Sequence, residues 1–86
     1  MASYNVLMTR SAAKELESVP TKDRQRIVTK IGAFASNPRP AGAEKLSVED
    51  KYRIRQGDCR ILYETVDEDL VVTVVRIGNR REVYRR

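Results

Sequence analysis

The sequence contains no histidine and no tryptophan, and only one cysteine and one phenylalanine. The lone cysteine, Cys59, excludes an internal disulfide, and without histidine neither a zinc site nor a Cys–His nucleophile is expected. Acid–base chemistry would have to use carboxylates, tyrosine, lysine or solvent. With no histidine and one cysteine, we expect no metal and no cofactor. One phenylalanine and four tyrosines are also too few for the stacking platform of a typical single-strand-binding module.

Long hydrophobic runs are also missing. No stretch approaches the roughly 20 apolar residues that a membrane-spanning helix needs, and the N-terminus lacks the basic and apolar regions of a signal peptide. These absences predict a cytoplasmic protein that does not bind membranes. A chain of 86 residues is long enough for one modest core, so we predict a single domain over residues 1–86.

Positive charge is what the sequence has in excess. It carries 17 Lys and Arg against 12 Asp and Glu, a net charge of +5, and 12 of the 17 cations are arginine. Arginine can bind phosphate through a planar pair of hydrogen bonds. The charge balance therefore favours a polyanionic partner such as nucleic acid.

The N-terminal half predicts one strand and two helices. Residues 4–8 are β-prone, and Thr9 can cap a helix over residues 11–18. A proline ends that helix, and Thr21 can cap a second helix over residues 22–36. Apolar residues recur at helical spacing in both segments, so their stripes are expected to cover a sheet. The expected core consists of Leu16, Ile27, Ile31, Phe34, Ile61, Tyr63 and alternate residues of 71–77.

Residues 51–64 predict a β-hairpin, because two runs rich in Ile, Leu and Tyr flank a Gln-Gly-Asp turn segment. In the first run Arg53 and Arg55 alternate with apolar residues, so both arginines point to one face. Past the turn, Arg60 lies on the face opposite Ile61. If the arginine faces of the two strands coincide, one sheet surface carries three guanidinium groups.

The remaining segments complete an α+β fold. Residues 37–42 form a loop, and residues 44–48 form either a short strand or irregular structure. Residues 70–77 are apolar on both faces and are predicted as the most buried strand, while residues 79–86 hold four arginines and a tyrosine. We expect two helices packed on a mainly antiparallel sheet of about four strands, followed by a short basic C-terminal element.

Three motifs carry a family resemblance: residues 52–55 (YRIR), 57–64 (GDCRILYE) and 75–84 (VRIGNRREVY). With the element order predicted above, the chain resembles the RelE/ParE superfamily of toxin–antitoxin toxins over nearly its whole length. The resemblance implies a small toxin that, in the RelE branch, enters the ribosomal A site and cuts mRNA. It also implies a cognate acidic antitoxin that binds the toxin in a hetero-oligomer, along the helices or over the arginines.

The resemblance also assigns site residues. The expected catalytic residues are Arg60, Arg80, Tyr84 and Glu44, and the expected RNA-binding residues are Lys51, Arg53, Arg55, Arg81 and Arg85. Three positions depart from the RelE pattern: Arg53 and Arg55 replace lysines, and Asn79 stands where many relatives have histidine. Arginine is too basic to accept a proton near neutral pH.

The groups left for proton transfer are Tyr84, Glu82, Glu64 and Glu44. Tyr84 is the first choice as general acid, and the base stays open between Glu44 and solvent.

Two other functions remain open at this stage. A ParE-like poison of DNA gyrase would have the same fold without nuclease activity, and the arginine and tyrosine at positions 80 and 84 argue against it. A small basic RNA-binding module is the third alternative.

Overall fold

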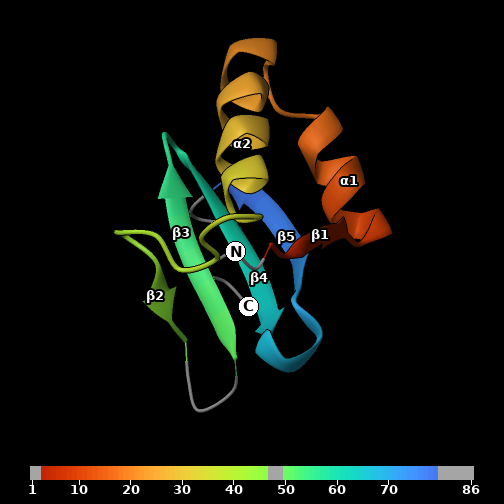
Figure 1. Cartoon of the computed structure of the whole chain (residues 1–86). Coiled ribbons are helices and arrows are strands. Elements are labelled where there is room, and N and C mark those ends of the chain that lie inside the picture. Colours follow the sequence, from red (N-terminus) through yellow and green to blue (C-terminus); the bar gives the residue numbers. More distant parts are fainter. Residues whose placement is uncertain (1–2, 47–49, 80–86) are drawn as a thin grey trace.

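The computed structural model describes residues 3–46 and 50–79. In chain order the elements are β1 (Asn5–Met8), α1 (Arg10–Glu17), α2 (Thr21–Ala33), β2 (Glu44–Lys45), β3 (Lys51–Gln56), β4 (Cys59–Val66), a 3-10 turn (Asp67–Asp69) and β5 (Val71–Asn79). The strands are ordered β1-β5-β4-β3-β2 (Figure 1). β1 runs parallel to β5, and the other neighbours are antiparallel.

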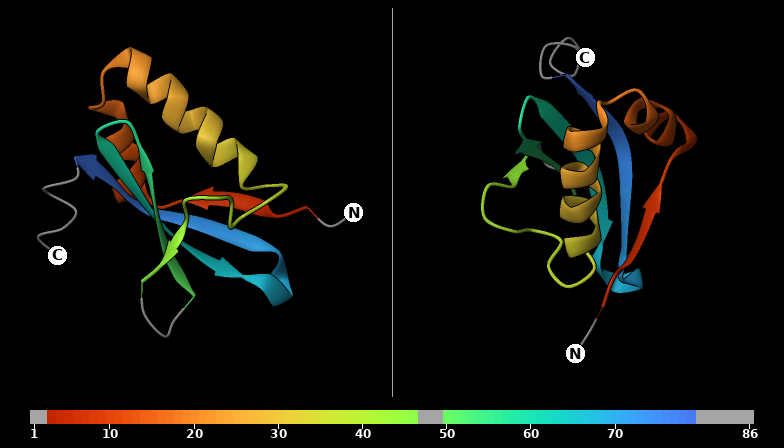
Figure 2. Two further views of the ribbon diagram at one scale, coloured as in Figure 1. Left: turned by 90° about the vertical axis from the view of Figure 1, so that its left-hand side faces the viewer. Right: turned by 90° about the horizontal axis from the view of Figure 1, so that it is seen from above.

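The molecule has two layers, with both helices on the same face of the sheet (Figures 1 and 2). This arrangement confirms the predicted α+β fold. Within the described ranges the sheet has five strands, against about four expected. The difference is the two-residue β2, in the segment that the sequence left undecided.

The core lies between the helices and the sheet. The expected members are buried there with two exceptions. Leu16 is only partly buried against the core, and the buried residues of β5 do not alternate strictly. The buried residues are Ala12, Ile27, Ile31, Phe34, Ile54, Cys59, Ile61, Tyr63, Val72, Val74 and Ile77. β5 is an inner strand, but the residues that alternate with its buried ones are only half-buried. The prediction that this is the most buried strand was therefore wrong, since in the described chain β4 has four buried residues against three on β5.

A β-bulge in β5 changes which residues face the core. Leu62 on β4 pairs with Arg76, whereas the next residue, Tyr63, pairs with Val74, so Val75 is an extra residue. The bulge lets Val74 and Ile77 both face the core although they are three residues apart. The Arg76 Nε instead donates a hydrogen bond of 3.0 Å to the Oε2 atom of Glu15 on α1.

The two helix starts differ in how they are capped. The Thr9 hydroxyl oxygen accepts a hydrogen bond of 3.1 Å from the Ala12 N–H, as predicted. The second prediction was wrong, because Pro20 occupies the N-cap position of α2 without a side-chain hydrogen bond. Thr21 is the first helical residue, and its hydroxyl oxygen accepts a hydrogen bond from Arg24.

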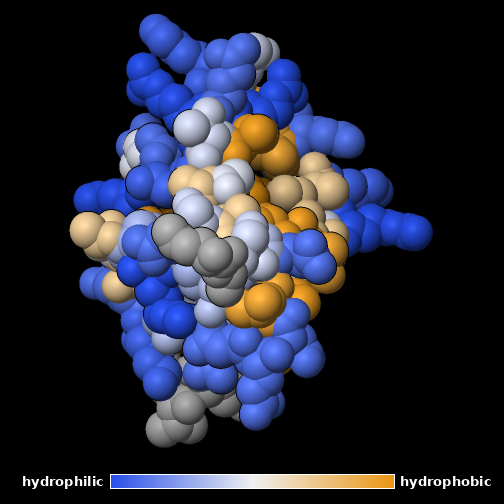
Figure 3. Space-filling view, viewed as in Figure 1, coloured by the Kyte–Doolittle hydropathy of each residue, from blue (hydrophilic) through white to orange (hydrophobic). Residues whose placement is uncertain are grey.

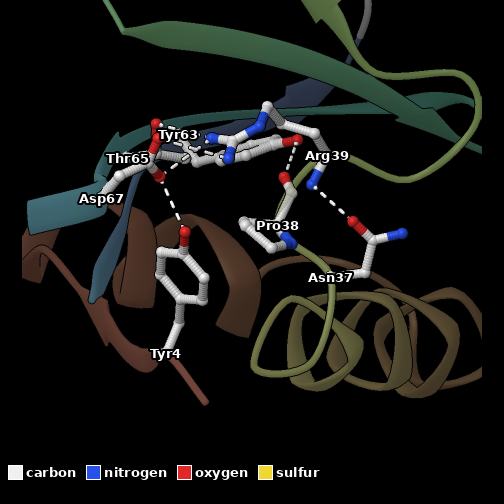
Figure 4. Close-up of polar contacts among 7 residues, drawn as sticks. All are labelled: Tyr4, Asn37, Pro38, Arg39, Tyr63, Thr65 and Asp67. Atoms are coloured by element: carbon white, nitrogen blue, oxygen red, sulfur yellow. Dashed lines mark hydrogen bonds and ion pairs between the residues drawn. The ribbon is translucent and has the colours of Figure 1, made fainter. Parts of the chain in front are cut away.

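The loop that leaves α2 is tied to the sheet by a polar cluster (Figure 4). The buried Tyr63 hydroxyl donates a hydrogen bond of 2.7 Å to the Pro38 carbonyl oxygen. The neighbouring Arg39 guanidinium donates to Thr65 on β4 and to Asp67, whose carboxylate also accepts from the Tyr4 hydroxyl. We call these contacts the loop anchor. It fixes the loop that leads directly into β2.

Candidate nucleic-acid interface

The β3–β4 hairpin presents its arginines on one face, as the sequence predicted. Its turn consists of Gly57 and Asp58, and Gly57 has a positive φ of 62°, which glycine adopts without steric cost. Arg55 pairs directly with Arg60 across the two strands. Paired residues point to the same face of a sheet, and Arg53 lies two residues from Arg55, so all three arginines share one face.

We call this surface the arginine face. It is opposite the face that carries the buried Ile54 and Ile61, on which both described helices lie. Arg55 is exposed, whereas Arg53 and Arg60 are half-buried and the Nε atom of Arg60 is buried. The side chains of Arg53 and Arg60 are therefore partly packed against the protein, which limits the side-chain entropy that ligand binding would cost.

The arginine face also carries two carboxylates. Glu44 on β2 pairs with Arg53, and Glu64 on β4 pairs with Lys51. The Lys51 Nζ lies 3.9 Å from a carboxylate oxygen of Glu64, which is a loose ion pair between partly exposed groups. This face is therefore positive overall, with acidic side chains at its margin.

Glu44 makes a short contact with Arg53 on this face. Its Oε1 atom accepts hydrogen bonds from Arg53 Nη2 at 2.7 Å and from Arg53 Nε at 3.2 Å. The hydrogen bonds from Arg53 lower the pKa of Glu44, and the positive charges of Arg53 and Arg60 act in the same direction. The carboxylate is thus ionised at neutral pH, and its basicity is reduced.

Four of the expected site residues, Arg80, Arg81, Tyr84 and Arg85, lie outside the described residues. β5 ends at Asn79, and Gly78 pairs with Arg60. The described chain therefore ends one residue past the position that pairs with Arg60.

Outside the arginine face, the features that bear on function are the cysteine thiol, possible metal ligands, possible membrane-spanning helices and exposed hydrophobic surface. Cys59 is buried, and burial raises the pKa of its thiol. Over residues 3–46 and 50–79, no group of three His, Cys, Asp or Glu side chains is placed to hold a metal ion. Nor does this part of the chain contain a helix long and apolar enough to cross a membrane. Figure 3 shows hydrophobic surface gathered around β1, where Leu7 is 53% exposed.

Comparison with known proteins agrees with this geometry. Residues 6–84 match the family described as the ParE toxin of the type II toxin–antitoxin system parDE. The chain belongs to the RelE/ParE superfamily of type II toxins. A putative RelE-like toxin protein of Escherichia coli is 29% identical over 94% of this chain and 90% of its own length.

Two further relatives link this superfamily member to the RelE branch. The mRNA interferase toxin RelE of Escherichia coli K12 is 30% identical over 85% of this chain and 81% of its own length. The toxin–antitoxin complex RelBE2 of Mycobacterium tuberculosis contains a chain that superimposes with a TM-score of 0.79 at 26% identity. That match covers 92% of this toxin and 100% of the other chain.

The sequence identified the arginines of this toxin but did not reveal the contact between Glu44 and Arg53. The two residues are brought together by β2, and a strand of two residues leaves no alternation to recognise. Glu44 entered the expected site only through the family resemblance.

Proposed function

We propose that this toxin is a ribosome-dependent endoribonuclease, an mRNA interferase that cleaves mRNA in the ribosomal A site and so stops translation. The observation that carries the proposal is the arginine face, where Arg53, Arg55 and Arg60 share one surface of a rigid hairpin. The name of the Escherichia coli relative, an mRNA interferase, supports it. Fixed cations can orient a phosphodiester and stabilise the charge that develops in its transition state.

The proposed reaction is an attack by the 2′-hydroxyl on the adjacent phosphorus. The new bond from the 2′-oxygen to phosphorus forms, the bond from phosphorus to the 5′-oxygen breaks, and the products carry a 2′,3′-cyclic phosphate and a 5′-hydroxyl. Arg60 and Arg80 stabilise the extra negative charge, and Tyr84 donates a proton to the leaving 5′-oxygen. Solvent accepts the 2′-hydroxyl proton, because the Glu44 Oε1 atom is already engaged by two hydrogen bonds from Arg53.

The RNA strand would be held by the remaining cations. Arg53 and Arg55 bind phosphates beside the scissile one, and Lys51, Arg81 and Arg85 extend the contact along the strand. No metal and no cofactor takes part in this scheme. We place the protein in the cytoplasm, where its substrate is translated.

The proposed partner is an acidic antitoxin. The net charge of +5 favours a negatively charged protein, and solved relatives include toxin–antitoxin complexes. An antitoxin segment that orders on the toxin surface would bury the arginine face or the helices and form a stable hetero-oligomer.

Cleavage of translated mRNA by purified toxin tests the proposal. Arg60→Ala should slow single-turnover cleavage on ribosomes about 10²–10³-fold, the usual effect of losing one transition-state donor. Arg26→Ala removes the same charge from an exposed position on α2 and should leave the rate nearly unchanged. Equal effects of the two variants, or a strict need for a divalent ion in the chemical step, would contradict the mechanism.

The role of Tyr84 has its own test. Tyr84→Phe keeps the ring and removes the hydroxyl, so it should reduce the single-turnover rate while ribosome binding is unchanged. If the ring only stacks on a base, the Phe variant will instead keep most activity and an Ala variant will lose it.

Inhibition of DNA gyrase is the second candidate, because the matching family is described by a parDE system. A supercoiling assay separates the two functions. Inhibition of gyrase by wild-type toxin that leaves translated mRNA intact would favour this alternative.

A further inference from the structure

We propose that Glu44 acts as an internal substitute for the RNA phosphate: it holds Arg53 in the empty site and is displaced when RNA binds. Glu44 would then be a positioning residue that sets the affinity for RNA, with no part in proton transfer. This inference rests on the proposed nuclease function and assigns one of its carboxylates a specific role.

The contact geometry carries the first step. Arg53 donates through Nε and Nη2 to the single atom Oε1, at 3.2 and 2.7 Å. These two nitrogens form the edge of the guanidinium group that also binds a phosphate oxygen pair in bidentate fashion. A carboxylate and a phosphate therefore compete for the same donors of Arg53.

Exposure decides which partner leaves. The Arg53 side chain is 22% exposed, whereas the Glu44 side chain is 61% exposed. Arg53 lies within the six-residue β3 and pairs with Leu62 on β4. Glu44 belongs to a strand of two residues at the edge of the sheet. The carboxylate can rotate into solvent without disturbing the core, while Arg53 stays at the arginine face.

The charges nearby explain what the contact achieves. Without an anion, Arg53 would lie on the same face as Arg55 and Arg60 and be repelled by them. Glu44 offsets this repulsion and keeps the guanidinium on the sheet, so that its orientation is set before RNA arrives. The loop anchor supports this position of Glu44, because it fixes the loop that leads into β2. The cost is that the RNA phosphate that binds Arg53 must displace a carboxylate.

A general base at this position would behave in the opposite way. Removal of the carboxylate would lower the maximal rate by about 10²–10⁴-fold. Removal of a displaceable phosphate substitute should instead leave the maximal rate in place and strengthen RNA binding. The two roles thus predict opposite changes in different kinetic constants.

The decisive experiment is single-turnover cleavage of mRNA on programmed ribosomes over a range of toxin concentrations. For Glu44→Gln we expect a maximal rate within about two-fold of wild type and a half-saturating concentration lower by up to about five-fold, the range of an exposed ion pair. The activity of this variant should also fall more steeply with added KCl, by up to about 0.7 in the slope of log activity against log salt concentration. In the variant no carboxylate neutralises Arg53 before RNA binds, so the phosphate releases a salt counterion from Arg53 instead.

Asp58→Asn is the matched control. It also removes one negative charge, but from the turn of the β3–β4 hairpin, away from the β2–β3 pair that joins Glu44 to Arg53. We expect no comparable change in half-saturation. In an Arg53→Ala background, Glu44→Gln should lose most of its tightening effect, since the donors for which the anions compete are gone.

The outcomes distinguish this inference from the function on which it rests. If wild-type toxin does not cleave, the nuclease function fails and the inference with it. If wild-type toxin cleaves, the inference alone is overturned by a large fall in maximal rate for Glu44→Gln, by an unchanged half-saturation, or by equal tightening in the Arg53→Ala background.

Discussion

Replacing Tyr63 with Phe should destabilise the domain while leaving its packing intact. The Tyr63 hydroxyl donates a hydrogen bond of 2.7 Å to the carbonyl oxygen of the buried Pro38. Phe keeps the ring stacked on Phe34, with ring centroids 4.2 Å apart, but leaves the carbonyl oxygen without this donor. An unsatisfied buried acceptor costs about 1–3 kcal/mol, so we expect the free energy of unfolding to fall by that amount.

The same residue predicts a change at alkaline pH. Burial raises the pKa of Tyr63 from 10.0 to about 12 in the folded protein. The unfolded chain therefore releases this proton first as the pH rises. The contribution of the Tyr63 hydroxyl to stability should be fully present below pH 10 and should decrease between pH 10 and about 12. The Phe variant has no such proton, so its stability should fall less over this window.

Urea denaturation followed by circular dichroism, at pH 7 and then across the alkaline range, measures both effects. Tyr52→Phe is the control, since it removes a hydroxyl from the half-buried neighbour in the same aromatic stack. A loss below about 0.5 kcal/mol for Tyr63→Phe at pH 7 would refute the hydrogen-bond argument, because that is within the range of ordinary surface substitutions. An equal loss in the control would also refute it.

Two further predictions concern stability. Hydrogen bonds from Tyr4 and Arg39 lower the pKa of Asp67 in the folded protein. The contribution of Asp67 to stability is therefore present above its ordinary pKa of 3.8 and is lost as the pH falls through the lower folded value. Acid titration should destabilise wild type more steeply than Asp67→Asn. An added methyl group meets no atom within 4 Å at either Gly32 or Gly57. Gly32→Ala, inside α2, should stabilise the fold by about 0.5–1 kcal/mol, whereas Gly57→Ala, at a φ of 62°, should destabilise it by about 1–2 kcal/mol; thermal unfolding of the pair should give shifts of opposite sign.

Local signals explain what could be read from the sequence. Arg53 and Arg55 alternate with apolar residues, and Gly57 supplies a turn that fixes the hairpin register. Those two facts were enough to predict a shared face with Arg60. The two helices could also be predicted, because their apolar stripes extend over several turns and do not depend on distant partners.

Non-local contacts explain what could not be predicted. The β-bulge at Val75 depends on how β5 meets β4, and its only signal was Arg76, a charged residue that strict alternation after Val72 and Val74 would have placed in the core. The loop anchor joins Arg39 to Asp67, which are distant in the sequence. The roles of Arg80 and Tyr84 stay predictions, since both lie outside the described residues.

The parallel pairing of β1 with β5 has a consequence for the folding rate. Asn5 is among the first described residues and pairs with Val71, in the last strand of the described chain. Closing so large a loop costs chain entropy before any contact compensates for it. β3 and β4 can form early as a local hairpin, but β1 must wait for β5. We therefore expect docking of the N-terminal strand to be the slow step in folding.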